Sequence, residues 1–183
     1  MINLITGCMF AGKTTKAINL SDDVGSCLYF KPAIDKRYSA DDIVTHDNIK
    51  RPALVLKNMT DCNNYFLNSK LAHCILIDEL QFFDSFIIQA IKEACNMGYQ
   101  VYVTSLNYYA DGSKPDRLEE LRKLENINEI KLKARCDCGK PAEFTAKMVG
   151  SLEQIIEIGG AKIYQAKCKK CFREIRRKQK GLK

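Results

Sequence analysis

Residues 7–14 constrain this chain more than any other segment, because they read GCMFAGKT and complete the pattern G-x-x-x-x-G-K-[ST]. The glycines of such a loop let the backbone curl until its N–H groups face phosphate oxygens. Lys13 supplies a positive charge for the β- and γ-phosphates, and the Thr14 hydroxyl can bind Mg²⁺. The sequence therefore predicts a nucleoside triphosphate site formed by Gly7, Cys8, Met9, Phe10, Ala11, Gly12, Lys13 and Thr14.

The flanking segments indicate an α/β fold rather than a chance glycine turn beside a solvated lysine. Residues 1–6 suit a strand and residues 16–20 suit a helix. We expect further strands at 27–30, 53–56, 74–77 and 101–104, and a helix whose apolar residues recur from 86 to 95 before Gly98 ends it. Because near-continuous apolar strands alternate with helices, the pattern favours a P-loop, RecA-like parallel sheet with helices on both faces.

Composition limits the class of protein. The 183 residues, of which 46% are apolar, suffice for one ordinary domain and a small appendage. No apolar run approaches the ~20 residues that cross a bilayer, and no charged leader precedes the first strand, so we expect a cytoplasmic protein without membrane contact. Five scattered cysteines fit a reducing compartment and small hydrophobic roles: Cys8, Cys27, Cys62, Cys74 and Cys95.

The net charge of +7 is unevenly distributed. Residues 162–183 hold ten Lys or Arg against one acid, a balance of +9, so residues 1–161 carry −2. The basic character belongs to the end of the chain, where it is typical of a solvated tail, with a weak polyanion contact as the alternative. We therefore expect no nucleic acid at the nucleotide-binding body.

A second unit is expected after residue 134, where cysteine and glycine become frequent. We divide the chain into a nucleotide-binding domain at 1–134, a zinc-binding domain at 135–175 and a basic tail at 176–183. Two cysteine pairs that bracket a loop favour a structural Zn²⁺ in a ribbon-like unit, with disulfides or free thiols as the alternative. The pairs are Cys136 with Cys138 and Cys168 with Cys171, and the C-x-C spacing of the first leaves its metal geometry open.

Asp78 and Glu79 follow the apolar run 74–77 and form the second acidic signature of a phosphate-loop fold. The Asp of such a pair helps to hold Mg²⁺, while the Glu activates a nucleophile. The pair alone allows an ATPase that activates water, a kinase that activates a hydroxyl, or two acids that cap the next helix. Glu79 is the candidate general base.

Several separated segments together resemble the thymidine kinases of the type II family. They are the phosphate loop, residues 31–38 (KPAIDKRY), 45–47 (THD), 78–83 (DELQFF) and 159–164 (GGAKIY), and the four late cysteines. The resemblance covers about residues 2–172. It implies transfer of a phosphoryl group from ATP to the 5′-hydroxyl of thymidine with Mg²⁺, deoxyuridine being a possible second acceptor. It also implies a homotetramer inhibited by thymidine triphosphate.

The resemblance also assigns roles to residues of this chain. Glu79 matches the family's general base, and Asp78 matches the residue near Mg²⁺. Asp35, Lys36 and Arg37 match a loop that approaches the ATP phosphates, and Gln81 lies in the same nucleotide-handling segment. A zinc-held loop called a lasso is expected to enclose the thymidine. The residues so implied at the thymidine site are Met9, Phe82, Leu106, Tyr109, Thr145, Ile155, Ile156, Glu157, Ile158, Gly159 and Tyr164.

Residues 107–115 form a polar segment long enough to act as a lid, with an ordinary surface connection as the alternative. Either Tyr108 or Tyr109 would take the place of the aromatic residue that the family has there. Phe83 is expected to pack in the core rather than to bind substrate. The rival function is a nucleic-acid-stimulated ATPase that combines a RecA-like core with a zinc ribbon and a basic tail.

Overall fold

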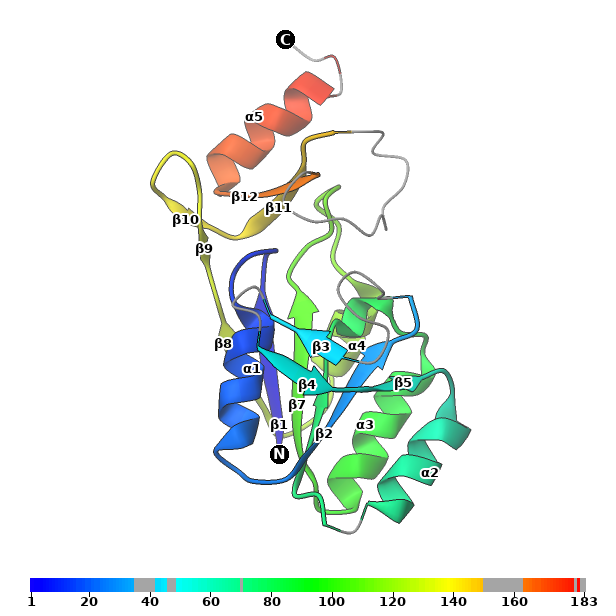
Figure 1. Ribbon diagram of the computed structural model, residues 1–183. Helices are drawn as coiled ribbons and strands as arrows, with labels where there is room; N and C mark the ends of the chain where they lie inside the picture. The colour runs from blue at the N-terminus through cyan, green and yellow to red at the C-terminus, as the bar shows by residue number, and fades with distance from the viewer. Residues whose placement is uncertain (35–41, 46–48, 70, 150–162, 180, 182–183) are drawn as a thin grey trace.

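The computed structural model describes residues 1–34, 42–45, 49–69, 71–149, 163–179 and 181. Its centre is a sheet of six parallel strands in the order β5-β2-β6-β7-β1-β8 (Figure 1). The strands are β1 (Ile2–Gly7), β2 (Cys27–Pro32), β5 (Leu54–Leu56), β6 (Cys74–Ile77), β7 (Gln100–Leu106) and β8 (Ile127–Lys131). The expected parallel α/β sheet is confirmed, including each strand anticipated from an apolar run.

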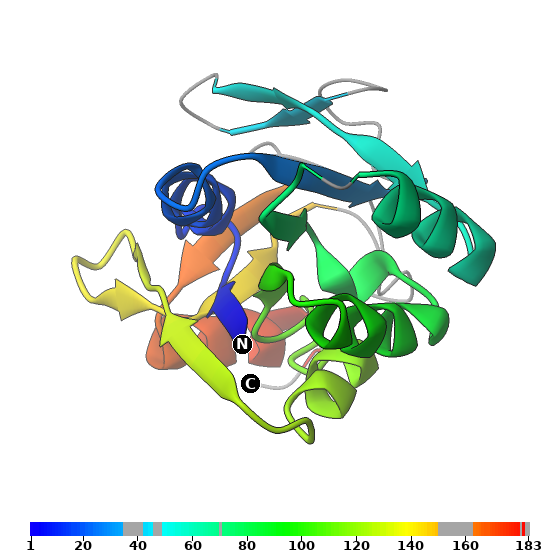
Figure 2. The same cartoon turned by 90° about the horizontal axis from the view of Figure 1, so that it is seen from below.

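Helices cover both faces of the sheet, as Figures 1 and 2 show. Helix α1 (Lys13–Asp22) packs on one face, and α2 (Met59–Asn68), α3 (Phe86–Asn96) and α4 (Asp116–Leu121) pack on the other. The alternation along β6 explains this, because Cys74 and Leu76 join the α1 core whereas Ile75 and Ile77 join the α3 core.

Local sequence signals explain where the helices begin and end. Asn58 caps α2 by accepting a hydrogen bond from the Asp61 backbone N–H at 3.0 Å. Gly98 follows α3 with φ of 90°, a conformation that favours glycine, and so ends the helix as expected. No helix among the described residues is both long enough and apolar enough to span a bilayer.

A hairpin that the sequence did not signal lies over the α1 side of the sheet. Its strands are β3 (Asp42–Val44) and β4 (Lys50–Pro52). Ile43 packs into the same core as Ala17 and Ile18 of α1. Arg51 reaches Asp22 at the end of α1 with an Nη2–Oδ2 distance of 2.6 Å. The hairpin is therefore fixed to α1 beside the phosphate loop.

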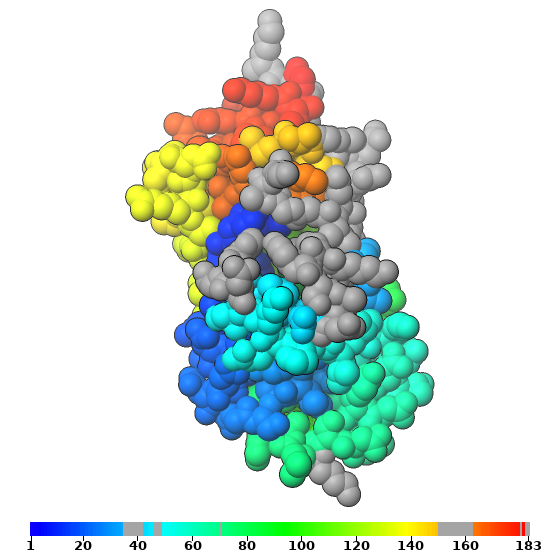
Figure 3. Space-filling view, viewed as in Figure 1, coloured from blue at the N-terminus to red at the C-terminus, as the bar shows by residue number. Residues whose placement is uncertain are grey.

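The end of the chain forms a smaller lobe beyond the carboxyl ends of the strands (Figures 1 and 3). It contains β9 (Ala134–Arg135) paired with β10 (Pro141–Ala142), β11 (Phe144–Lys147) paired with β12 (Tyr164–Lys167), and helix α5 (Lys169–Gln179). The boundary suggested between residues 175 and 176 falls inside α5. The basic residues 176–178 thus belong to a helix that was not predicted from the sequence. The helix is rich in charged residues and buries Phe172, so its sequence shows little apolar periodicity.

Candidate active site

The phosphate loop turns sharply between β1 and α1, and two glycines allow the turn. A Cβ atom on Gly7 would lie 2.8 Å from the carbonyl oxygen of Leu132 and 2.9 Å from the Cβ of Ala11, closer than real Cβ contacts come. Gly12 has φ of 75°, in the left-handed region. Phe10 also has a positive φ, 66°. The backbone therefore takes the curled path that a phosphate-binding loop requires.

Lys13 and Thr14, at the start of α1, face the loop and the end of β6. Lys13 is buried, and its Nζ donates to the carbonyl oxygen of Cys8 at 3.0 Å. The hydroxyl of Thr14 donates to Oδ1 of Asp78 at 3.1 Å. Thr104, on β7, donates to the same Asp78 oxygen. Thr14 and Asp78, each expected at a Mg²⁺ site, are thus hydrogen-bonded to each other, and both line one pocket with Lys13.

Glu79 stands at the end of β6 in a left-handed backbone conformation, with φ 55° and ψ 52°. Its N–H donates to the hydroxyl of Thr104 at 2.9 Å. After it comes a single 3₁₀ turn, η1 (Leu80–Phe82), which begins by burying Leu80 completely in the core. Non-glycine residues in this region are strained and are held there by surrounding structure. Here Thr104 and Leu80 hold the backbone, and Glu79 lines the same pocket as Lys13.

Another part of the pocket wall comes from β2 and β3. Lys31 is buried at the end of β2, and its Nζ donates to the carbonyl oxygen of Asp42 at 3.1 Å. Residues 42–45 line this wall with Lys31. The expected phosphate contacts Asp35, Lys36 and Arg37 lie outside the described residues.

The side chains anticipated for thymidine come from both lobes. The N–H of Met9, in the phosphate loop, donates to the hydroxyl of Thr145 on β11 at 3.0 Å. Tyr164 is buried on β12, where it pairs with Lys147, two residues beyond Thr145 on β11. Leu106 ends β7, and Phe82 is half-buried in η1. The structure thus brings Met9 to Thr145 between the lobes, whereas Ile155, Ile156, Glu157, Ile158 and Gly159 lie outside the described residues.

The segment 107–115 links β7 to α4 and contacts both lobes. Tyr108 stacks on Phe144 of β11, with ring centroids 4.7 Å apart, and Phe144 stacks on Phe172 of α5 at 4.8 Å. The hydroxyl of Tyr109 instead donates to the backbone carbonyl of Gln81 at 3.2 Å. Burial, followed by the charge of Asp116, raises the pKa of Tyr109, so this hydroxyl stays protonated as a donor. The two tyrosines therefore make different contacts: Tyr108 packs on the C-terminal lobe, and Tyr109 binds η1 two residues after Glu79.

Phe83 lies in the main core, edge-on to Phe86 with ring centroids 6.3 Å apart, as expected.

Cys8, in the phosphate loop, is buried, and burial is the main cause that raises the pKa of its thiol. The neutral thiol donates to the carbonyl oxygen of Ala142 on β10 at 3.4 Å. Cys8 is thus more than a small hydrophobe, because it fastens the phosphate loop to the C-terminal lobe.

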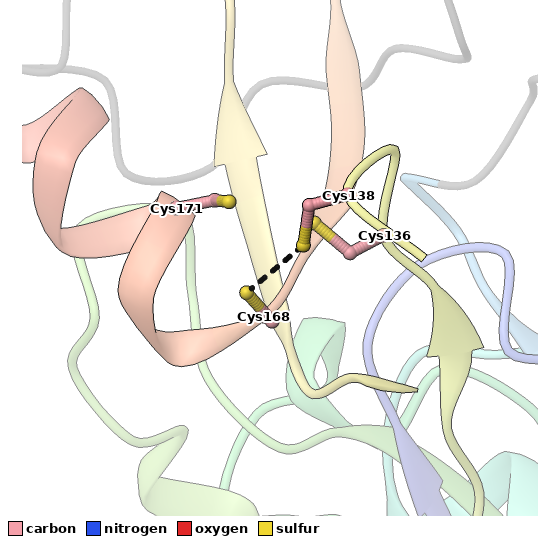
Figure 4. Close-up of side chains that lie close together, drawn as sticks. All are labelled: Cys136, Cys138, Cys168 and Cys171. Atoms are coloured by element: carbon pink, nitrogen blue, oxygen red, sulfur yellow. Dashed lines mark hydrogen bonds between the residues drawn. The ribbon is translucent and has the colours of Figure 1, made fainter. Parts of the chain in front are cut away.

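The four late cysteines converge in the C-terminal lobe (Figure 4). Cys136 and Cys138 come from the β9–β10 turn, Cys168 follows β12, and Cys171 lies in the first turn of α5. All four Sγ atoms lie within 4.8 Å of one another. A tetrahedral zinc with Zn–S bonds of about 2.3 Å requires sulfurs about 3.8 Å apart. The Cys138–Cys168 sulfur distance of 3.6 Å matches this, so the C-x-C pair can grip a metal with its partners.

The ionisation of these thiols also fits a cation. Burial opposes ionisation of Cys136, but hydrogen bonds from the backbone of Cys168 and Cys138 and from neighbouring thiols outweigh it and lower the pKa of Cys136 to about 6. The pKa of Cys171 is raised to about 12, chiefly by the side chain of Cys168. The pKa of Cys168 is lowered as well, chiefly by a hydrogen bond from the backbone of Cys171, so two of the thiols ionise more readily than usual, and zinc binds the thiolate form.

Sequence reasoning missed Lys31, Thr104 and Ser105 at this site. All three are buried polar residues near the carboxyl ends of apolar strands. Such ends meet along one edge of a parallel sheet, where α/β proteins bind ligands. That rule was a usable signal for all three residues.

Comparison with known proteins agrees with this geometry. The family model described as thymidine kinase matches residues 1–172. The thymidine kinase of Mycoplasma capricolum subsp. capricolum is 34% identical over 185 residues, covering 93% of this chain and 88% of that protein. The thymidine kinase of Mycoplasma mycoides subsp. mycoides SC is 31% identical over 192 residues, with the same two coverages.

Among solved structures, the ATPase DotB of Legionella pneumophila matches with a TM-score of 0.45 and 20% identity, covering 76% of this chain and 42% of that one. The family model and the two Mycoplasma relatives decide the assignment. This chain belongs to the thymidine kinase family and is an ATP-dependent nucleoside kinase.

Proposed function

We propose that this enzyme transfers the γ-phosphoryl group of ATP to the 5′-hydroxyl of thymidine, with Glu79 as the general base. The observation that carries the proposal is that Glu79 lines the same pocket as Lys13, Thr14 and Asp78. A carboxylate beside the phosphate-binding groups can accept the proton of a hydroxyl that attacks the terminal phosphorus.

The residues of the loop divide the remaining work. The backbone N–H groups of residues 7–14 and the ammonium of Lys13 bind the phosphates. When ATP binds, the hydrogen bond from Lys13 Nζ to the Cys8 carbonyl would be replaced by one to a phosphate oxygen. Thr14 and Asp78, already joined by a hydrogen bond, would hold Mg²⁺. When bound, Mg²⁺ neutralises charge on the β- and γ-phosphates. Asp35, Lys36 and Arg37 would complete the set of nucleotide-binding residues.

We place thymidine between the two lobes. Met9 and Thr145 meet there through a hydrogen bond, and Tyr109, Phe82, Leu106, Tyr164 and residues 155–159 are proposed to enclose the base with them. Enclosure excludes water, which would otherwise accept the phosphoryl group. The four-cysteine cluster would hold Zn²⁺ and so maintain the lobe that carries Thr145. Deoxyuridine as an alternative acceptor, a cytoplasmic homotetramer and inhibition by thymidine triphosphate remain part of this proposal.

The test is an acceptor assay with Mg-ATP labelled in the γ-phosphate. We expect label on thymidine, and we expect Glu79→Gln to lower the transfer rate roughly 10²–10⁴-fold while ATP binding, measured by equilibrium titration, stays within about two-fold. The matched control is Glu93→Gln, a half-buried carboxylate on α3 outside the pocket, which should leave the rate unchanged. Label on phosphate that increases with DNA, while thymidine stays unlabelled, would instead establish the nucleic-acid-stimulated ATPase.

A further inference from the structure

The side chain of Gln81 is held in one orientation by the end of β7. Gln81 is buried in η1, and its Oε1 accepts the Leu106 backbone N–H at 3.1 Å and the Ser105 hydroxyl at 3.3 Å. Because a backbone N–H can only donate, the amide atom that faces Leu106 must be the oxygen. The amide nitrogen is consequently forced to point the other way.

The group on that other side is the carboxylate of Glu79. Nε2 of Gln81 lies 2.5 Å from Oε2 of Glu79 and donates to it. The backbone of Gln81 is fixed as well, because its carbonyl accepts the hydroxyl of Tyr109 at 3.2 Å. A chain of donors thus runs from β7 and Tyr109 through Gln81 to one oxygen of Glu79.

This arrangement has two chemical consequences for a carboxylate base. A hydrogen bond donated to an ionised carboxylate favours the ionised form and lowers its pKa. It also fixes the direction in which the carboxylate group points, because Nε2 of Gln81 holds Oε2 of Glu79. A base that must be ionised and correctly turned near neutral pH benefits from both effects.

We propose that Gln81 is a positioning residue that holds and keeps ionised the Glu79 carboxylate, rather than a group that binds the nucleotide. The inference rests on the proposed role of Glu79 as the base. It replaces the nucleotide-binding role that the family resemblance implied for Gln81, because both ends of its amide are engaged by the protein.

The sharpest variant is Gln81→Glu, which keeps an oxygen for Leu106 and Ser105 but replaces the donor to Glu79 with a second acid. We expect the single-turnover transfer rate to fall roughly ten-fold on the acid limb of its pH profile. The rate should recover as the pH is raised, because the acid limb of the pH profile moves up by about one pH unit or more. The KM for ATP should stay within about two-fold. Gln81→Met, which removes the donor without adding charge, should move the limb in the same direction.

The chain offers a matched control in Gln89 on α3, an exposed glutamine whose Nε2 donates to Oε1 of Glu93 at 3.1 Å. Gln89→Glu should leave the pH profile unchanged. A ten-fold rise in the KM for ATP with an unmoved acid limb would assign Gln81 to the nucleotide and overturn the inference, as would a wild-type profile in folded Gln81→Glu and Gln81→Met. If Glu79→Gln itself retained transfer, the proposed base would fall, and this outcome is distinct from both.

Discussion

At the scale of the residue, the site depends on a few backbone conformations that each side chain must tolerate. Glu79 is held in the left-handed region, and this turns the chain from β6 directly into η1. The turn places Glu79 and Gln81 on the same side, where their side chains meet. An extended residue at position 79 would continue the strand and separate them, so the strain is part of how the acid and its donor are brought together.

Gly7 gives the first prediction at this scale. A Cβ at position 7 would lie less than 3.0 Å from both the carbonyl oxygen of Leu132 and the Cβ of Ala11. Gly7→Ala must therefore shift either the phosphate loop or residue 132. Overpacking of this kind costs about 1–3 kcal/mol of the free energy of unfolding. We expect urea denaturation to show this loss, and ATP titration to show weaker binding.

Gly12 is the control for this prediction, because no atom lies within 4 Å of a Cβ there and only its φ of 75° disfavours a side chain. Asparagine tolerates that conformation better than alanine does. Gly12→Asn should therefore be more stable than Gly12→Ala, whereas Gly7→Asn should be no better than Gly7→Ala. Equal stability of Gly7→Ala and the wild type would show that the close approach is absent.

At the scale of the element, one contact between the lobes is an aromatic stack. The rings of Tyr108, Phe144 and Phe172 come from the 107–115 segment, β11 and α5, and successive ring planes differ by 17° and 18°. A Cβ on Gly112 would be in contact with the Phe172 ring at 3.4 Å, so the segment itself packs on the stack. The anticipated lid is thus tied to the C-terminal lobe at Tyr108 and to η1 at Tyr109.

The stack predicts measurable coupling between elements. In a double-mutant cycle of Tyr108→Leu and Phe144→Leu, we expect a coupling energy of about 0.5–1.5 kcal/mol, in addition to the free energy that each ring contributes through its buried area. Urea denaturation of the four proteins measures it. Tyr65→Leu combined with Phe144→Leu is the control, since Tyr65 packs on Phe30 in the sheet core and should be additive. Additivity in both cycles would mean that the stacked rings contribute only buried area.

Sequence patterns predicted this fold where the signal was local or periodic. The phosphate loop, the strand that precedes Asp78, and α3 with its glycine stop all follow from spacing within one segment. The β3–β4 hairpin gave no such signal. Its strands are short, and Arg51 contacts Asp22 of α1, which is distant in the sequence. The partners of Gln81 were equally hidden, since Leu106 N–H and Tyr109 reach it from 25 and 28 residues away.

At the scale of the whole molecule, the phosphate loop is held between two lobes. Cys8 donates to β10, Met9 donates to β11, and the carbonyl of Gly7 accepts the N–H of Asn107. Three consecutive loop residues are therefore fixed by both lobes, and the C-terminal lobe contributes to the shape of the nucleotide site. The apolar cluster of that lobe is small and includes Cys8 of the phosphate loop, so we expect the lobe to depend on a further restraint for its folding.

Removal of the metal tests this dependence. We expect about one zinc per chain by elemental analysis, and loss of it in Cys138→Ser or after chelation. The melting temperature should then fall by roughly 5–10 °C, since a structural zinc contributes several kcal/mol. Because β11 carries Thr145 while Lys13 and Thr14 belong to α1, the KM for thymidine should rise more than the KM for ATP. Cys95→Ser, a half-buried thiol on α3 outside the cluster, should change neither zinc content nor either KM. A zinc-free protein with unchanged melting and kinetics would show that the four thiols hold the lobe together without a metal.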